Sequence, residues 1–204
     1  MIKTVLPLIL LLLPAVLSAK DFFGDPVITA PQPELFSVCY DHSCTTIVTD
    51  SLSPDEWQLA TAALRQPHRT SADEREAIAA AVAVMEQIVG RHIGTSVDIG
   101  RNLRGFGRPF QMDCIDESTN SNSYLLMFER DGLLKYHTVV SRSTRFGLFV
   151  GMPHTTAVIE DNATHQRYVV DSWFHDNGQP PFIEKLEVWK AGGDPDKDSG
   201  VAGR

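Results

Sequence analysis

The sequence predicts a mixed α+β fold, because helical patterns fill its first half and strand patterns fill its second half. Apolar residues recur at helical spacing between residues 53 and 92, which indicates two amphipathic helices. β-Branched residues dominate three segments between residues 135 and 174, as is typical of strands. A third helix is expected between these two regions, and it begins at a cysteine.

The first 19 residues have the features of a secretory signal peptide. Lys3 provides a positive start, Val5 to Val16 is apolar apart from two prolines, and Leu17-Ser18-Ala19 offers small residues for cleavage. We therefore expect a secreted or periplasmic protein with no stable membrane insertion after cleavage. An uncleaved N-terminal anchor is the alternative. The rest of the chain, about 185 residues, suits one domain.

The charge of the chain excludes some classes of partner. The formal net charge is −8, and no basic stripe interrupts it. Nucleic acids and anionic membrane surfaces are both recognised mainly by clustered Lys and Arg. We therefore expect neither as a partner.

Three cysteines divide into a close pair and a single residue. Cys39 and Cys44 lie five positions apart and can close a small loop in an oxidising compartment. Cys114 is then left as a free thiol and a candidate nucleophile. Residues 20–50 are interpreted as an extended N-terminal arm that contains the disulfide loop, because its first part is rich in proline.

The two helices between residues 53 and 92 have clear start and stop signals. Ser53-Pro54-Asp55-Glu56 combines a capping Ser, a Pro at the first helical position and a Glu three residues after the cap. Pro67 ends this helix. Ser71 and Glu74 open the second helix, which is expected over residues 71–92 and stops near Gly94.

Residues 94–113 are rich in Gly and Arg. Their spacing matches neither the dinucleotide-binding pattern nor the P-loop, so a long loop is favoured over a phosphate site. The arginines of this loop remain candidates to line a cleft for an acidic substrate.

The third helix is expected to run from Cys114 to about Asp131, with Gly132 as its stop. Asp116 and Glu117 suit a first turn, where the helix end is positive. A helix N-terminus would also lower the pKa of the thiol. The polar middle of this segment favours helix formation only weakly. A loop with a helix beginning only near Asn122 is the alternative.

Three strands follow, over residues 135–144, 154–160 and 167–174. The last two are separated by a turn of about five residues and are expected to form a hairpin. One pairing register brings His154 and Asp171 together at one end of this hairpin. Residues 192–204 are rich in Gly and Asp and are interpreted as a disordered tail.

This order of a Cys at a helix start, a strand, a His-led strand and an Asp-bearing strand resembles the transglutaminase-like branch of the papain-like cysteine enzymes. Pro153-His154-Thr155-Thr156-Ala157-Val158 is similar to the His strand of that family, and Tyr168-Val169-Val170-Asp171-Ser172-Trp173 is similar to its Asp strand. The resemblance covers roughly residues 94–175. The whole chain also resembles secreted proteobacterial proteins, a likeness that adds nothing about activity.

The resemblance implies a papain-like core within a domain over residues 51–191. In that core the Cys-bearing helix packs on an antiparallel sheet, with the two helices of residues 53–92 in front. It also implies that Cys114 is the nucleophile, His154 its base and Asp171 the residue that orients the imidazole.

Several other residues are candidates for supporting roles. The backbone N–H of Cys114 and the side chain of Gln111 are candidate oxyanion donors, although Gln111 is equally well interpreted as a loop residue. His137 is the alternative base. A zinc site at Cys114, its acidic neighbours and His154 is disfavoured, because no ligand-spacing motif is present. No cofactor is expected.

These residues favour a secreted cysteine hydrolase or acyltransferase that acts on peptide amides of a peptide or protein substrate. A peptidoglycan stem peptide is one such substrate. The alternative is a catalytically silent transglutaminase-like module that binds a cell-envelope partner, because Asp113, Asp116 and Glu117 crowd the thiol with negative charge. A third hypothesis makes Cys114 a structural thiol, buried or paired with another chain.

Overall fold

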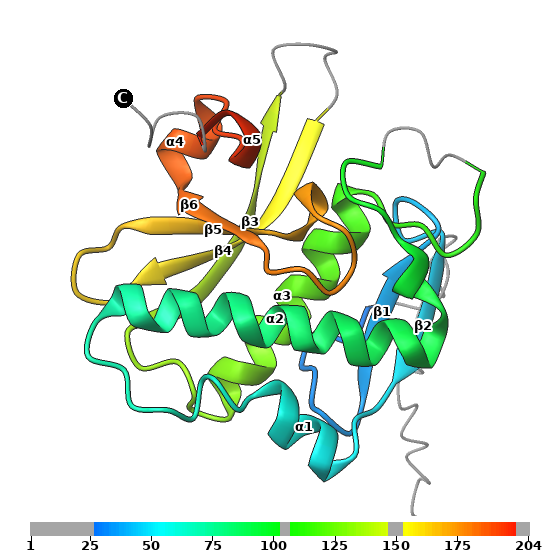
Figure 1. Ribbon diagram of the computed structural model, residues 1–204, viewed down its shortest axis with the longest axis horizontal. Coiled ribbons are helices and arrows are strands. Elements are labelled where there is room, and N and C mark those ends of the chain that lie inside the picture. Colours follow the sequence, from blue (N-terminus) through cyan, green and yellow to red (C-terminus); the bar gives the residue numbers. More distant parts are fainter. Residues whose placement is uncertain (1–26, 103–106, 147–152, 199–204) are drawn as a thin grey trace, which may run out of the picture.

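The computed structural model describes residues 27–102, 107–146 and 153–198 (Figure 1). The predicted signal peptide and residues 199–204 of the predicted tail lie outside these ranges. Within them the chain forms six strands, five α-helices and two short 3-10 helices. In chain order these are β1 (Phe36–Tyr40), β2 (Thr46–Asp50), α1 (Pro54–Ala60), α2 (Ser71–Ile93), η1 (Thr95–Val97), α3 (Cys114–Arg130), β3 (His137–Phe146), β4 (Pro153–Asp161), β5 (Arg167–Asp171), η2 (Ser172–Phe174), β6 (Phe182–Lys185), α4 (Leu186–Lys190) and α5 (Pro195–Asp198). The mixed α+β class is therefore confirmed.

The larger sheet is antiparallel, with the strand order β3-β4-β5-β6. β3 is an edge strand, and its pairing with β4 shifts between Val140 and Ser143. α3 packs against this sheet, and its residues Leu125 and Phe128 share one apolar core with Ile159 of β4. This packing brings the first turn of α3 to the end of the sheet where β4 begins.

The first two helices form largely as expected, and α2 crosses the molecule in front of α3 (Figure 1). Ser53 caps α1 with a reciprocal bond to Glu56. α2 is capped by Thr70, one residue before the predicted Ser71, because Asp73 completes the capping box. It ends at Gly94, whose φ of 97° is readily adopted only by a residue without a Cβ.

The interpretation of residues 20–50 as an extended arm is wrong for residues 36–50. They form the β1-β2 hairpin, and Phe36, Val38 and Cys39 of β1 are buried. Phe36 meets Tyr124 of α3 edge to face, with 6.3 Å between the ring centroids. Each strand has only five residues, too few for a clear alternation pattern, so the hairpin is recognisable only from its packing.

The polar middle of α3 is helical from Cys114 onward, which excludes the late start near Asn122. Three of its hydroxyl side chains form hydrogen bonds within the helix. Ser118 and Thr119 donate to the Ile115 carbonyl, and Ser123 donates to the Thr119 carbonyl. These residues are buried, so tertiary packing outweighs their weak helix propensity.

The sequence analysis did not predict β6 or α4, and it interpreted residues from 192 onward as disordered. Residues 192–198 are instead ordered and include α5. Arg101 binds Asp194 at 2.6 Å, and Arg145 donates to the carbonyls of Trp189 and Gly193.

None of the helices in the described ranges is long and apolar enough to cross a bilayer.

Candidate functional site

Cys114 is the first residue of α3 and a free, partly buried thiol. Asp113 caps the helix by accepting from the N–H groups of Ile115 and Asp116. The sulfur lies 3.8 Å from the Pro153 carbonyl oxygen, at the start of β4. The positive end of the helix therefore faces the residue that precedes His154.

His154 and Asp171 lie together at the same end of the sheet, as the hairpin register predicts. The imidazole Nε2 lies 2.7 Å from the Asp171 Oδ2. The side chain of His154 is 12% exposed and that of Asp171 only 2%. The imidazole is surrounded by the rings of Trp173, Phe174 and Trp189, with centroids 4.7 to 5.6 Å away.

Trp189 belongs to this site. Its indole N–H donates to the Asp171 Oδ2 at 2.8 Å, which is the oxygen that also binds His154. It comes from α4, a helix without a strong sequence signal. Trp189 reaches the Asp171 carboxylate because β6 pairs with β5 and α4 packs against both strands.

The surroundings of His154 favour the charged imidazolium. Burial lowers its pKa, but hydrogen bonding to Asp171 and to Cys114, together with their charges, outweighs burial and raises the pKa to about 9. Because Asp171 occupies Nε2, Nδ1 is the ring nitrogen left to interact with the thiol. A thiolate next to an imidazolium is the reactive state of a cysteine nucleophile.

The two candidate oxyanion donors differ. The backbone N–H of Cys114 has no hydrogen-bond partner among the described residues, as expected at a helix N-terminus. Gln111 is buried in the loop before α3, where its amide donates to the Val97 carbonyl and accepts from Asn102. The geometry therefore gives Gln111 a structural role and does not support it as an oxyanion donor.

His137 lies at the far end of the sheet, because it opposes Asp161, the last residue of β4, whereas His154 is the second residue of that strand. Its ring nitrogens contact Glu74 at 2.9 Å and Arg75 at 3.2 Å. This arrangement leaves it neither a free nitrogen nor access to Cys114. His137 is therefore corrected from an alternative base to a residue of the core.

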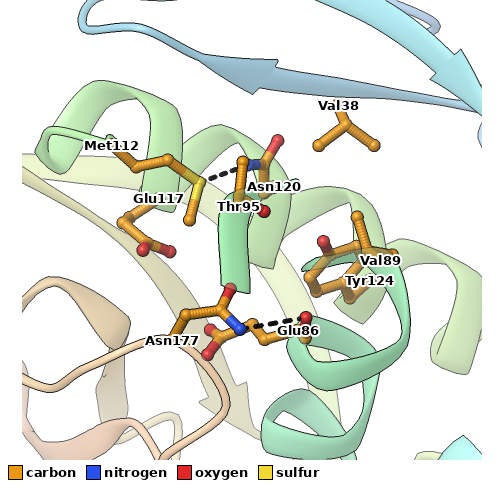
Figure 2. A pocket seen from close by; sticks show the side chains of 9 residues that line it. All are labelled: Val38, Glu86, Val89, Thr95, Met112, Glu117, Asn120, Tyr124 and Asn177. Atoms are coloured by element: carbon orange, nitrogen blue, oxygen red, sulfur yellow. Dashed lines mark hydrogen bonds between the residues drawn. The ribbon is translucent and has the colours of Figure 1, made fainter. Parts of the chain in front are cut away.

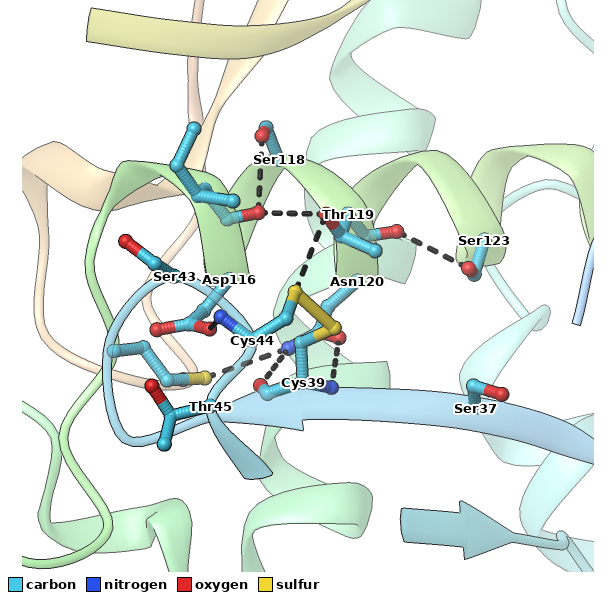
Figure 3. The surroundings of a disulfide bond; sticks show 12 residues. Ser37, Cys39, Ser43, Cys44, Thr45, Asp116, Ser118, Thr119, Asn120 and Ser123 are labelled. Carbon is cyan, nitrogen blue, oxygen red and sulfur yellow. Dashed lines mark hydrogen bonds between the residues drawn. A yellow bond between two sulfur atoms is a disulfide. The ribbon is translucent and has the colours of Figure 1, made fainter. Parts of the chain in front are cut away.

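The acidic residues next to Cys114 hold the disulfide loop (Figure 3). The Cys39–Cys44 bond expected from the spacing is present. Asp113 accepts from the backbone N–H and the hydroxyl of Ser43, and Asp116 accepts from the Cys44 N–H at 2.6 Å. The loop exposes these N–H groups because residues 41–44 all have φ between 53° and 67°, in the left-handed region.

One turn further along α3, Glu117 lines a small pocket together with Glu86 (Figure 2). Asp98 is also buried, and its charge acts on Glu117. Burial, followed by the charges of the neighbouring acids, raises the pKa of Glu117 well above its ordinary value. Burial also raises the pKa of Glu86 to about 7 and that of Asp98 to about 6. The cavity lined by Glu86 and Glu117 is too small to admit a water molecule.

The pKa of Asp116 is raised in the same way. Burial is the largest cause, and the charge of Asp113 adds to it, so that its pKa lies near 7. The acids below the thiol therefore carry less negative charge at neutral pH than their number indicates.

Among the described residues, Cys39, Cys44 and Asp116 are the set whose atoms approach at metal-ligand distance. Both sulfurs of that set are bound in the disulfide, which removes them as metal ligands.

Comparison of the chain with protein-family models, with curated proteins and with solved structures finds no match. Cys114, His154 and Asp171 are therefore the residues whose arrangement points to a function.

Proposed function

We propose that this protein is a secreted cysteine-dependent hydrolase or acyltransferase that acts on peptide amide bonds, with a transglutaminase-like, papain-like core. The observation that carries the proposal is the hydrogen bond from Asp171 to His154, an imidazole whose pKa is raised in part by Cys114, the first residue of α3. If the protein is exported to a periplasm, peptidoglycan stem peptides are available substrates there.

The residues support the following reaction. The Cys114 thiolate attacks the amide carbonyl carbon, and the backbone N–H of Cys114 donates to the oxyanion. The His154 imidazolium then gives its proton to the amide nitrogen, the C–N bond breaks, and a thioester remains on Cys114. Water or an amine loses a proton to His154 as it attacks the thioester, and the released thiolate restores the ion pair.

The acidic residues near Cys114 are the sequence feature that favours a silent module binding an envelope partner. In the structure Asp113 and Asp116 receive hydrogen bonds from the disulfide loop, and the environment of Glu117 favours its neutral form. These contacts weaken the reason for expecting a deactivated thiol, and they leave the enzyme as the better-supported proposal.

Alkylation with iodoacetamide tests the proposal, since Cys114 is the one cysteine outside the disulfide. At pH 6 we expect Cys114 to react at least about 30-fold faster than a free thiol, because the proposed mechanism requires a reactive thiolate–imidazolium pair with His154. His154→Ala should remove this acceleration. His165→Ala is the matched control, because that histidine is 78% exposed and binds Glu160. Equal, slow alkylation of the protein and of His154→Ala would contradict the proposal.

A further inference from the structure

A shallow groove runs beside α3, between this helix and the edge strand β3. Its volume is about 720 Å³. The lining residues are Asn122, Leu126, Val139, Val140, Ser141, Arg142 and Arg167. On α3 the groove is lined by Asn122 and Leu126, about two and three turns after Cys114. Arg142 links this lining to Ser118 and Thr119, which lie closer to Cys114 in the same helix.

Arg142 differs from three other arginines around the sheet, Arg75, Arg101 and Arg167. Each of those three binds a carboxylate. Arg142 has no carboxylate within ion-pair distance in the described ranges, and its partners are two hydroxyls of α3. Its Nη1 donates to Ser118 at 3.1 Å and to Thr119 at 2.6 Å.

These hydroxyls hold the guanidinium in one orientation, because each also donates to the Ile115 carbonyl. The hydrogen bonds of Arg142 all use Nη1, which leaves the N–H groups of Nε and Nη2 without a protein partner among the described residues. This edge of a guanidinium matches the two oxygens of a carboxylate. The bulge between Val140 and Ser143 places Arg142 in the lining of the groove.

We infer that the groove is a substrate subsite in which Arg142 binds a carboxylate of the acyl donor. The inference rests on the proposed function and specifies its substrate class. Arg142 contacts α3 four to five residues after Cys114, about 6 to 8 Å along the helix axis. That span equals about two residues of extended peptide. The substrate is therefore a peptide with a carboxylate within two residues of the scissile amide.

The surrounding charge makes this arginine necessary for such a substrate. The protein carries a net charge of −8, which repels an acidic peptide from most of the surface. Arg167 also lines the groove, but Glu160 binds it at 2.8 Å and offsets its charge. Arg142 is thus the lining cation that keeps its charge for a ligand.

Two alkylating peptides that differ only in one charge test the inference. Chloroacetyl-glutamic acid amide and chloroacetyl-glutamine amide both react when the Cys114 sulfur displaces chloride from the α-carbon, so that an S–C bond forms and the chloride leaves with its electron pair. The quantity compared is the ratio of their second-order rate constants with the full chain. We expect Arg142→Gln to lower this ratio about tenfold, the contribution of one charge-assisted pair.

Arg130→Gln is the matched control. It removes the same charge from an exposed position of α3, about 24 Å from Cys114 along the helix axis, and should leave the ratio unchanged. Arg142→Lys keeps the charge but loses the planar fork, so the ratio should fall between those of the parent and of Arg142→Gln. An unchanged ratio in Arg142→Gln and Arg142→Lys, with rapid alkylation by both peptides, would overturn the subsite alone. Alkylation by both peptides at the rate of a free thiol would overturn the proposed function instead.

Discussion

The two ends of the large sheet each hold a histidine bound to a carboxylate, and they differ in what surrounds the pair. At one end His154 binds Asp171 at 2.7 Å, and at the other His137 binds Glu74 at 2.9 Å. The His137–Glu74 pair is fully buried, whereas His154 keeps 12% of its side-chain surface exposed. The first pair faces a free thiol and the second faces Arg75.

The difference lies in the second ring nitrogen, so a histidine–carboxylate pair alone does not identify a candidate catalytic site. Both ring nitrogens of His137 have protein partners, so the pair fixes the start of β3 against α2. The carboxylate of Glu74 also accepts from the N–H groups of Lys135 and Tyr136. At the His154 end, one ring nitrogen is held by Asp171 and the other remains for proton transfer.

Removing the buried pair should have the largest effect on stability. We expect His137→Ala to lower the free energy of unfolding by about 3 to 5 kcal/mol, because it leaves Glu74 buried without a main partner. Alkylation of Cys114 at pH 6 should keep its parent rate, since His137 lies at the other end of the sheet. Urea unfolding and iodoacetamide labelling measure the two quantities.

His154→Ala is the reciprocal variant, and it should slow alkylation with a smaller loss of stability. Slow alkylation in folded His137→Ala, or an equal loss of stability in both variants, would remove the distinction between the two ends.

The two pairs should also respond to opposite extremes of pH. His154 has its pKa raised from 6.5 to about 9, so the folded protein holds this proton more tightly than the unfolded chain. The stability from this pair is complete below pH 6.5 and is lost as the pH rises through about 9. For Glu74, burial raises the pKa, but hydrogen bonds from His137 and the backbone outweigh burial and lower it. That stability is present above pH 4.5 and is lost as the pH falls.

Urea unfolding across pH 3 to 10 measures both contributions. We expect the parent to lose about 2 kcal/mol more than Asp171→Asn between pH 7 and pH 10. Glu74→Gln should lose less stability than the parent between pH 4.5 and pH 3. The buried acids Glu86 and Glu117 also contribute stability that is lost as the pH rises. Both acids are present in the parent and in the variants, so the difference in free energy of unfolding between parent and variant isolates the contribution of each pair. Parallel pH profiles for the parent and both variants would contradict this assignment.

Local signals predicted the elements that have caps or long periodic faces. Ser53 with Glu56, the apolar face of residues 71–92 and Gly94 depend on nearest neighbours in the chain, so the sequence alone indicates them. The same holds for the hairpin that brings His154 to Asp171, because strand alternation and a short turn restrict the register.

The contacts that sequence analysis missed are those between distant segments. The β1-β2 hairpin depends on Asn120 of α3, whose amide bonds both the N–H and the carbonyl of Cys39, 81 residues away. The role of Asp113 and Asp116 likewise depends on N–H groups of the disulfide loop. A run of acids in the sequence therefore predicts repulsion, whereas the fold supplies donors that are absent from the local sequence.

The smallest expected effect concerns how Asp171 is held, and Trp189→Phe tests it. This variant keeps the ring against His154 but removes the N–H that donates to the Asp171 Oδ2. We expect the free energy of unfolding to fall by about 1.5 kcal/mol, the contribution of one hydrogen bond to a charged group. Alkylation of Cys114 should slow severalfold, and its pH dependence should shift, because the carboxylate that holds the imidazole is less constrained.

Trp173→Phe is the matched control for this variant. Its ring also contacts His154, at 4.7 Å, but its N–H has no acceptor among the described residues, so the pH dependence of alkylation should remain that of the parent. No tryptophan variant at the His137 end corresponds to Trp189→Phe, because Glu74 accepts from backbone N–H groups there rather than from an indole. If both tryptophan variants shift the pH dependence equally, ring packing alone positions the imidazole. A shift confined to Trp189→Phe assigns the effect to the indole N–H and makes Trp189 a positioning residue of the proposed triad.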